Sequence, residues 1–330
     1  MDLPENLRTA LDETLKMTTP KSLTHLAEEL SQRYRTGHAQ GQQTFLHSKE
    51  DIIAYAAYRL PATFAAAYAA LVEVRKRQPE WQPHTMLDAG AGPGTAMWAT
   101  ATLCPELERV TLLEWDQHMI TYGKRLAMLA HSPVITEATW QNIDLTGQWE
   151  HESYDLVIAA YVLGELPRLT LDAVLSRLWS CTAGVLLLVE PGTPRGFSLI
   201  RHARDYLLSN GAKMVAPCPH DHTCPMPAHD WCHFAHRITR TRLQRAIKGA
   251  SLSYEDEKFS YVALSHTTSV PIPGRVLRHP QKRSGHIHLE LCTSEGLKHT
   301  IVTRSQRTAF REAQDLHWGE AISEIVPEPH

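Results

Sequence analysis

The sequence has 330 residues and a mass of 37.2 kDa, enough chain for about two domains. Hydrophobic residues make up 43% and charged residues 21%, values that exclude a largely disordered or fibrous chain. No uninterrupted apolar run approaches the ~18–20 residues that cross a bilayer, and Gly184 to Val189 is only strand-sized. The acidic amino terminus resembles neither a signal peptide nor a transit peptide, so we expect a cytoplasmic protein.

Charge is divided unevenly along the chain. Residues 1–194 contain 15 Lys and Arg against 23 Asp and Glu, whereas residues 195–330 contain 18 against 13. The net charge of −3 therefore combines an acidic first half with a basic second half. A basic half favours a polyanionic partner; the alternative is a solvated basic surface that binds no partner.

Helical and strand-like patterns follow one another along the chain. Apolar residues at helical spacing predict helices within the first 80 residues, where Pro61 kinks a helix or starts a new one. From Thr85 onward, short apolar runs alternate with helical segments, which predicts a parallel, doubly wound sheet. The expected strands are Thr85–Ala89, Val110–Glu114, Ala138–Ile143, Tyr154–Ala160 and Val185–Glu190. A basic helix is expected over Arg237–Lys248, followed by alternating, strand-like segments.

A glycine-rich loop follows the first expected strand. In MLDAGAGPGTA, Asp88 precedes Gly90, Gly92 and Gly94, and the loop leads into a helix. Glycines permit a tight turn and let backbone N–H groups approach a ligand closely. The D-x-G-x-G-x-G form resembles motif I of class I S-adenosylmethionine (SAM)-dependent methyltransferases, which implies that the loop faces the methionine part of that cofactor.

The ends of the next strands fit the same cofactor. Glu114 ends the second strand, where a carboxylate would accept hydrogen bonds from both ribose hydroxyls, and Asp144 follows the third, where methyltransferases often contact adenine. The segment YDLVIAAYVLGEL resembles motif IV, which places Ala160 and Tyr161 at the sulfonium end. No catalytic residue is assigned; Glu165 is the nearest candidate base, and helix capping is its structural alternative.

Three cysteines cluster in a segment rich in proline and histidine. Cys218, Cys224 and Cys232 form C-x5-C-x7-C, and Cys292 offers a fourth thiolate from an expected strand. In an intracellular chain such clustering favours metal binding over disulfides. The histidines that compete for the fourth position are His220, His222, His229 and His233. Spacing predicts a structural metal site and leaves zinc and iron–sulfur both open. The other two cysteines are expected to be buried in the core.

Segments from about residue 48 to 318 resemble one family. The segments that are similar to it are RLPATFAAAYAAL, LDAGAGPGTA, EPGTPRGF, CPHDHTCP, DWCHF, KFSYVALS and HLELCTSEG. This family consists of ribosome-associated methyltransferase-like proteins and includes mitoribosomal small-subunit members and mitochondrial methyltransferase-like protein seventeen. The resemblance implies a [4Fe–4S] cluster bound by Cys218, Cys224, Cys232 and Cys292. It also implies action on the small ribosomal subunit, in rRNA methylation or assembly. The lack of a transit peptide differs from the mitochondrial members and suggests a bacterial cytoplasmic relative.

These observations define one expected architecture. We expect an α/β, Rossmann-like class I SAM-dependent methyltransferase core with an N-terminal helical region, a Cys-rich metal-binding insertion and a C-terminal β-rich extension. The expected boundaries are 1–80 for the helical region, 81–270 for the core with its insertion at 211–250, and 271–330 for the extension.

The expected function is that of a SAM-binding, iron–sulfur rRNA methyltransferase of the small ribosomal subunit. The alternatives are a non-catalytic assembly factor, in which cofactor and cluster are structural, and a cluster-based redox sensor. We expect a monomer without membrane contact. The residues expected to contact rRNA phosphates are Arg237, Arg240, Arg242, Arg245 and Lys248.

Overall fold

The computed structural model describes residues 1–16, 24–26, 49–150, 152–248 and 251–323, so much of the first 48 residues lies outside the described part. The main described helices are α1 (Glu5–Leu15), α3 (Lys49–Tyr58), α4 (Leu60–Arg77), α5 (Thr95–Leu103), α6 (Gln117–Met128), α7 (Pro133–Thr136), α8 (Leu171–Ser180), α9 (Pro194–Ser209), α10 (Arg242–Lys248) and α11 (Arg307–Asp315). Two 3₁₀ turns are η1 (Leu163–Glu165) and η2 (Arg168–Thr170). No described helix is long and apolar enough to span a membrane.

Eight strands form the larger sheet. They are β1 (Thr85–Ala89), β2 (Arg109–Glu114), β3 (Thr139–Asn142), β4 (Tyr154–Ala160), β5 (Thr182–Pro191), β6 (Lys213–Ala216), β7 (Phe234–Thr239) and β8 (Tyr254–Ser265). Their order is β3-β2-β1-β4-β5-β8-β6, and β7 pairs with β8. The first five pair in parallel, whereas β8 runs antiparallel to its neighbours. This is the strand arrangement of the class I SAM-dependent methyltransferase fold, which confirms the expected fold class of the core.

Helices cover both faces of this sheet and create two hydrophobic layers. Successive residues of β1 point to opposite faces: Met86 packs in the layer that contains α4 and α5, and Leu87 in the layer that contains α8 and α9. A strand buried on both faces is largely apolar, and in β1 Met86, Leu87 and Ala89 are buried beside a single buried carboxyl, Asp88. The carboxyl ends of β1 to β4 meet at one edge, which is where open α/β sheets bind ligands.

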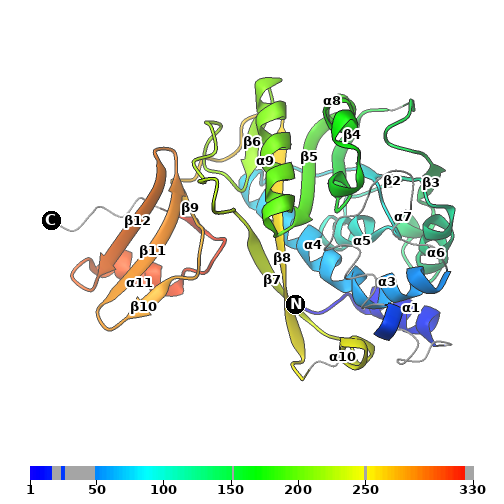
Figure 1. Cartoon of the computed structure of the whole chain (residues 1–330), viewed down its shortest axis with the longest axis horizontal. Coiled ribbons are helices and arrows are strands. Elements are labelled where there is room, and N and C mark those ends of the chain that lie inside the picture. The colour runs from blue at the N-terminus through cyan, green and yellow to red at the C-terminus, as the bar shows by residue number, and fades with distance from the viewer. Residues whose placement is uncertain (17–23, 27–48, 151, 249–250, 324–330) are drawn as a thin grey trace.

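A smaller antiparallel sheet stands beside the main body (Figure 1). Its strands are β9 (Gly274–Val276), β10 (Gln281–Arg283), β11 (His286–Thr293), β12 (Gly296–Thr303) and β13 (Ala321–Ile322). Helix α11 packs on one face of it through Phe310 and Ala313. Arg275 of β9 links the two parts, because it contacts Glu73 of α4 and donates from Nε to the carbonyl of Pro217 at 2.9 Å.

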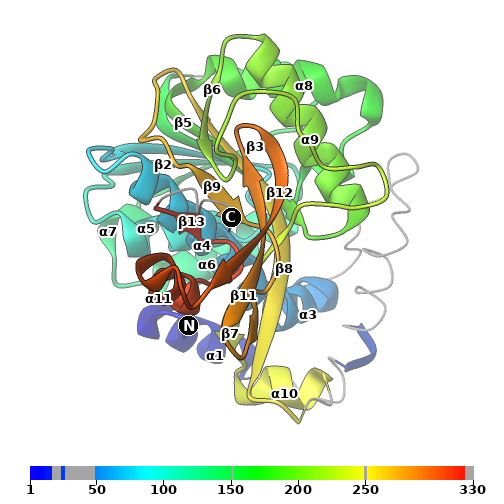
Figure 2. The same ribbon diagram turned by 90° about the vertical axis from the view of Figure 1, so that its left-hand side faces the viewer.

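The expected strands agree with the structure, but the expected basic helix is partly wrong. Residues up to Thr239 belong to β7, and the helix begins only at Arg242. Phe234 and Ile238 are both buried, and a spacing of four residues fits one face of either a strand or a helix. Figure 2 shows β7 and β8 running together toward α10. Pairing with β8 therefore decides the structure of residues 234–239.

Candidate functional site

The glycine-rich loop after β1 turns sharply into α5. Gly90, Gly92 and Gly94 have φ angles of 71°, 54° and 82°, which L side chains rarely adopt. A Cβ at Gly90 would lie 2.4 Å from Val162 Cγ2, so the loop passes close to the segment after β4. A Cβ at Gly92 would meet no atom of the described residues within 4 Å. The backbone at Gly92 therefore faces open space that a ligand can enter.

Glu114, at the end of β2, lies beside this loop. Its Oε2 accepts the N–H of Gly92 at 2.7 Å, and its Oε1 accepts the N–H of Asp116 at 2.8 Å. Glu114 is 7% exposed, and burial raises the pKa of its carboxyl. Carboxylate oxygens have more than one lone pair, so both keep the capacity to accept a further hydrogen bond. The fold thus brings Glu114 and the loop together.

Asp88 and Asp144 lie in contrasting surroundings. Asp88 is buried at the end of β1, and its Oδ2 accepts the N–H of Met97 in the first turn of α5 at 3.3 Å. Burial raises the pKa of Asp88 to about 7. Asp144 is exposed after β3, where its Oδ1 accepts the backbone N–H of Thr146 at 2.8 Å. Asp88 therefore supports the loop from inside, whereas Asp144 lies at the surface.

Tyr161 follows β4 with a φ of 61°, uncommon for a residue other than glycine. Its hydroxyl donates to Glu257 Oε1 at 3.0 Å, and Arg59 Nη2 donates to the same oxygen at 3.1 Å. The Arg59 guanidinium also lies 5.5 Å from the centroid of the Tyr161 ring. Burial, reinforced by Glu257, raises the pKa of Tyr161 well above its ordinary value. This network joins the N-terminal helices to β4, where Ala160 is half-buried, and to β8.

Two further carboxyls approach the same edge of the sheet. Glu190 of β5 is buried, and its Oε1 accepts the N–H of Leu163 at 2.8 Å. Burial raises the pKa of Glu190 to about 7 and that of Glu165 to about 8, with Glu114 adding to the second shift. Glu190 thus binds the backbone of the turn η1, which contains Glu165. Sequence reasoning missed Glu190, although it ends an apolar strand as Glu114 does.

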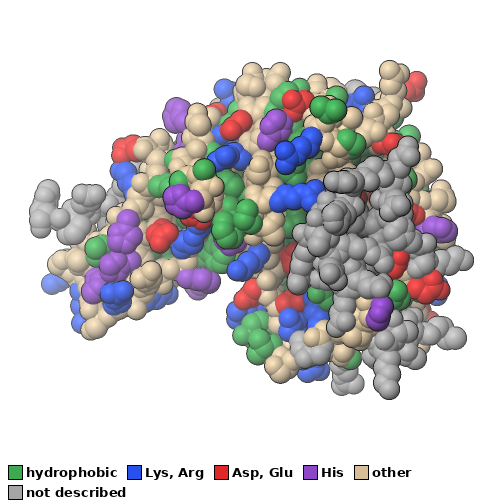
Figure 3. Space-filling model, viewed as in Figure 1, with side chains coloured by type: hydrophobic (Ala, Val, Ile, Leu, Met, Phe, Trp, Pro, Cys, Tyr) green, Lys and Arg blue, Asp and Glu red, His purple; other side chains and the backbone are tan. Residues whose placement is uncertain are grey.

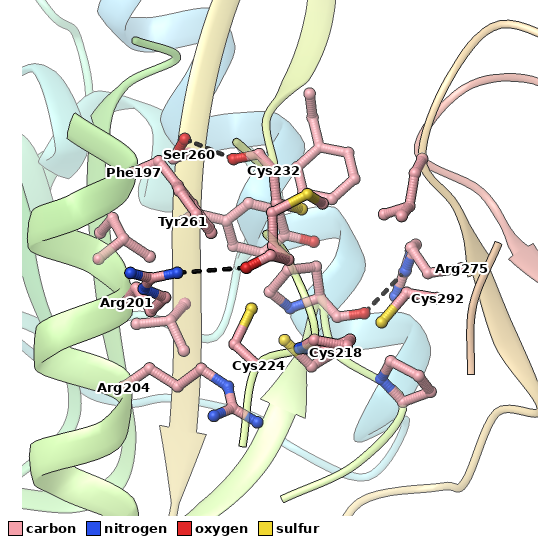
Figure 4. Close-up of a pocket in the computed structure, with 18 of the residues that line it drawn as sticks. Phe197, Arg201, Arg204, Cys218, Cys224, Cys232, Ser260, Tyr261, Arg275 and Cys292 are labelled. Carbon is pink, nitrogen blue, oxygen red and sulfur yellow. Dashed lines mark hydrogen bonds between the residues drawn. The ribbon is translucent and has the colours of Figure 1, made fainter. Parts of the chain in front are cut away.

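The four clustered cysteines line a single cavity (Figure 4). Cys218 and Cys224 come from the irregular segment between β6 and β7, Cys232 precedes β7, and Cys292 lies on β11. The cavity thus draws its cysteines from the main body and from the small sheet. The remaining cysteines, Cys104 and Cys181, are buried as expected and do not line this cavity.

Burial makes these thiols hard to ionise. It raises the pKa of Cys292 to about 12, that of Cys232 well above its ordinary value, and that of Cys224 as well, and neighbouring thiols add to each rise. A bound cation would reverse this electrostatic cost. Among the described residues, no three His, Cys, Asp or Glu side chains converge on a point suited to one metal ion. All four cysteines nevertheless line the same cavity.

Two histidines, His220 and His233, lie close to the cysteine segment but do not line the cavity. His220 Nε2 is 3.8 Å from Cys292 Sγ, and His233 Nδ1 is 3.3 Å from the carbonyl of Trp231. Burial lowers the pKa of both imidazoles. The described residues that line the cavity include no histidine. Cys292 is therefore better placed than any of these histidines to be the fourth ligand.

A family model described as "Mitochondrial small ribosomal subunit Rsm22" matches residues 49–323. The chain belongs to the Rsm22 family. This confirms the family resemblance of the sequence segments. The match takes in both the glycine loop and all four cysteines of the cavity.

The sequence is similar to two mitochondrial proteins of known name. Human "Ribosome assembly protein METTL17, mitochondrial" is 29% identical over 299 residues, which cover 83% of this chain and 63% of that protein. "Rsm22-cox11 tandem protein 2, mitochondrial" of Schizosaccharomyces pombe is 28% identical over 328 residues, covering 82% and 42%. The chain therefore spans less than two thirds of these relatives. A solved structure, magnesium protoporphyrin IX methyltransferase from Synechocystis with bound SAM, is 15% identical with a TM-score of 0.40, covering 71% of this chain and 90% of that one.

Most of the expected RNA-binding cations of this Rsm22-family chain form ion pairs with β8. Arg237 donates from Nε and Nη2 to Asp256 at 2.7 and 2.9 Å, and Arg240 and Lys248 both contact Glu255. Arg245 is exposed, and the side chain of Arg242 lies outside the described part. Basic and histidine side chains also gather on the small sheet (Figure 3). The exposed ones there and next to it include Lys282, Arg283, His299, Arg304, Arg307 and Arg311.

Proposed function

We propose that this Rsm22-family protein binds SAM at the carboxyl edge of β1 to β4, holds a [4Fe–4S] cluster in the cysteine cavity, and acts on the small ribosomal subunit. The observation that carries the SAM assignment is the contact between the Glu114 carboxylate and the open turn at Gly92. The family match supports the small-subunit assignment.

The residues at the sheet edge fit the parts of SAM. The loop from Gly90 to Gly94 would receive the methionine part, and Glu114 would accept the ribose hydroxyls through the lone pairs left free by its two backbone contacts. Asp144 would lie at the adenine end. Ala160 and Tyr161 would lie near the sulfonium. When bound, SAM supplies an electrophilic methyl group. Asp88 would act indirectly, because it anchors α5 behind the loop.

The donor set of the cavity fits an iron–sulfur cluster. Four thiols are the usual ligands of a [4Fe–4S] cluster, and here they are Cys218, Cys224, Cys232 and Cys292. A zinc ion is the alternative; its ~2.3 Å bonds to sulfur require the thiolates to meet around one point. The resemblance of the cysteine-bearing segments to the ribosome-associated family favours the cluster. Such a group would tie the irregular segment before β7 to the small sheet.

Exposed cations would provide the electrostatic contact with rRNA. Arg245 on α10 and the exposed cations around the small sheet point to solvent, and each phosphate contact contributes a salt-dependent share of affinity. Arg237, Arg240 and Lys248 are paired with acids of β8, so they would contribute less. Shape and single-stranded segments would carry most of the RNA selectivity.

Methyl transfer to small-subunit rRNA is the first candidate activity. The sheet edge would place an acceptor base in line with the methyl group, and most of the rate would come from proximity and orientation. Glu165 and Glu190, with pKa values raised to about 8 and 7, could hold a proton near neutral pH at this edge. Mass spectrometric mapping of small-subunit rRNA with and without the gene tests this activity. A methyl mark that disappears with the gene and returns only with protein competent in SAM binding is expected.

Non-catalytic assembly is the second candidate, and one observation favours it. The partly buried network of Arg59, Tyr161 and Glu257 occupies the end of β4, where an acceptor would approach the sulfonium. A SAM molecule held behind this network would stabilise the fold without reacting. The same mapping separates the candidates: small-subunit association of the protein together with an unchanged set of rRNA methylations supports assembly and contradicts methyl transfer.

A further inference from the structure

Two arginines that line the cysteine cavity carry buried N–H groups without a partner. Arg275 is 1% exposed and Arg204 is 3% exposed, so both guanidiniums are almost fully removed from solvent. The Nη2 of Arg275 and the Nε of Arg204 have no hydrogen-bond partner among the described residues. A buried, charged donor left unpaired costs free energy, so each calls for an acceptor.

The other donors of these arginines hold the cysteine segment in place. Arg204 Nη2 donates to the carbonyls of His220 and His222, and its Nη1 donates to Asp205 Oδ1 at 2.8 Å. Arg275 binds the segment from the opposite direction through the carbonyl of Pro217. Figure 4 shows the two arginines on different sides of the cavity, Arg204 on α9 and Arg275 beside Cys292. Their orientation is therefore fixed by the loop that carries Cys218 and Cys224.

Their positive charges act on the thiols. Burial raises the pKa of Cys292, and Arg204 and Arg275 oppose that rise. Burial also disfavours both guanidinium charges, but nearby groups that include Cys218 outweigh it, so the pKa of each arginine is raised. Asp205 and Glu73, the acidic partners, lie on α9 and α4 and do not line the cavity. Inside the cavity itself, the arginines lie among the four cysteines and a largely apolar wall.

We propose that Arg204 and Arg275 donate these N–H groups to sulfur atoms of the [4Fe–4S] cluster and raise its reduction potential. The inference rests on the proposed function, since it assumes the cluster in this cavity. A cubane with four thiolate ligands is a dianion. One-electron reduction adds an electron to the iron–sulfur core, breaks no bond to cysteine and gives a trianion. Nearby positive charge and N–H donors stabilise the more negative form, so they favour reduction.

The test is an anaerobic redox titration with dithionite as the electron donor, followed by electron paramagnetic resonance. Iron and sulfide are first counted in each purified protein. Arg204→Gln and Arg275→Gln are expected to retain the cluster and to shift its midpoint potential to more negative values, and the double variant is expected to shift it further. Arg109→Gln is the control: Arg109 lies on β2, four strands away from β8 in the order of the sheet, and it does not line the cavity. Its midpoint potential is expected to equal that of the wild type.

The outcomes separate this inference from the proposed function. A wild-type protein without iron and sulfide overturns both. A loaded wild type whose potential is matched by both loaded Gln variants overturns only the inference. If the Gln variants lose their iron, the variant Asp205→Asn tests the inference instead. Asp205 is a half-exposed acid that pairs with Arg204 from outside the cavity. Removal of its charge is expected to raise the midpoint potential, and an unchanged potential overturns the inference.

Discussion

The carboxylate of Glu114 accepts the backbone N–H of Gly92 at 2.7 Å, across 22 residues of sequence. The contact joins the end of β2 to the tip of the loop after β1, so two neighbouring parallel strands present their ligand-binding groups together. Both residues lie at the edge where open α/β sheets bind ligands.

The loop glycines differ in what an added methyl group would meet. Gly90→Ala is expected to destabilise the fold by ~2–4 kcal/mol, because its Cβ would lie 2.4 Å from Val162 Cγ2 at a φ of 71°. Gly92→Ala is the matched control and should cost about 1–2 kcal/mol, since it adds left-handed strain alone. Urea unfolding of both variants measures the difference. Equal losses would contradict the close approach at Gly90.

Asp88 makes stability depend on pH. Its pKa is raised to about 7 in the fold by burial, whereas an unfolded Asp ionises near pH ~3.9. Between these values the folded protein binds more protons, so this contribution to stability falls as pH rises and is lost above pH ~7. The stability of Asp88→Asn relative to the wild type should therefore increase by ~3 kcal/mol between pH 4.5 and 8. Urea unfolding across this pH range measures the gap. A gap that does not change with pH would contradict the buried, protonated carboxyl; Asp144→Asn serves as the exposed control.

The four cavity cysteines should act as one set of ligands. Alanine at Cys218, Cys224, Cys232 or Cys292 is expected to remove most of the iron and the visible absorbance of protein purified without oxygen. Cys104→Ala, at a buried cysteine outside the cavity, should retain both. Iron and sulfide counts check this directly. A colourless wild type with stoichiometric zinc would instead establish the alternative metal.

Exposed and paired arginines should differ in RNA binding. Arg245→Ala is expected to weaken rRNA binding and to reduce the slope of log affinity against log salt by ~0.7–0.9, the value of about one phosphate contact. Arg237→Ala should have a smaller effect, because Arg237 is held by Asp256 through two hydrogen bonds. Binding of a small-subunit rRNA fragment at several salt concentrations compares the two. An equal loss of affinity for both variants would contradict the view that the ion pair with Asp256 on β8 keeps Arg237 from binding RNA.

The sequence predicted the parts of the fold whose signals are local. β1 and β4 have the predicted bounds because strands buried on both faces are largely apolar. The prediction of a helix at residues 237–239 was wrong: the spacing of the buried Phe234 and Ile238 fits a strand as well as a helix, and only pairing with β8 resolves it. The helix start itself had a local signal: Thr241 and Gln244 exchange hydrogen bonds as a capping box.

Parts of the candidate site had no local signal at all. Arg59, Tyr161 and Glu257 meet at one oxygen although about 100 residues separate each from the next. Nothing in the sequence around any one of them indicates the other two. Likewise, Arg204 lies on helix α9 and Arg275 on strand β9 of the small sheet, and they meet the cysteines only through the tertiary fold. Clusters of this kind form only through tertiary packing, so the sequence does not predict them. Glycine loops and strand-end carboxylates are recognisable from the local sequence.

Calorimetric titration of SAM into anaerobically purified, cluster-loaded protein tests the central assignment most directly. The predicted result is one binding site per chain, with affinity reduced ~10- to 100-fold in Glu114→Gln, since hydrogen bonds to a charged group contribute about 1.5–3 kcal/mol. Glu137→Gln, at an exposed glutamate, should bind like the wild type. Absence of binding to the loaded wild type, or equal affinity of Glu114→Gln, would contradict the assignment of this edge of the sheet to SAM.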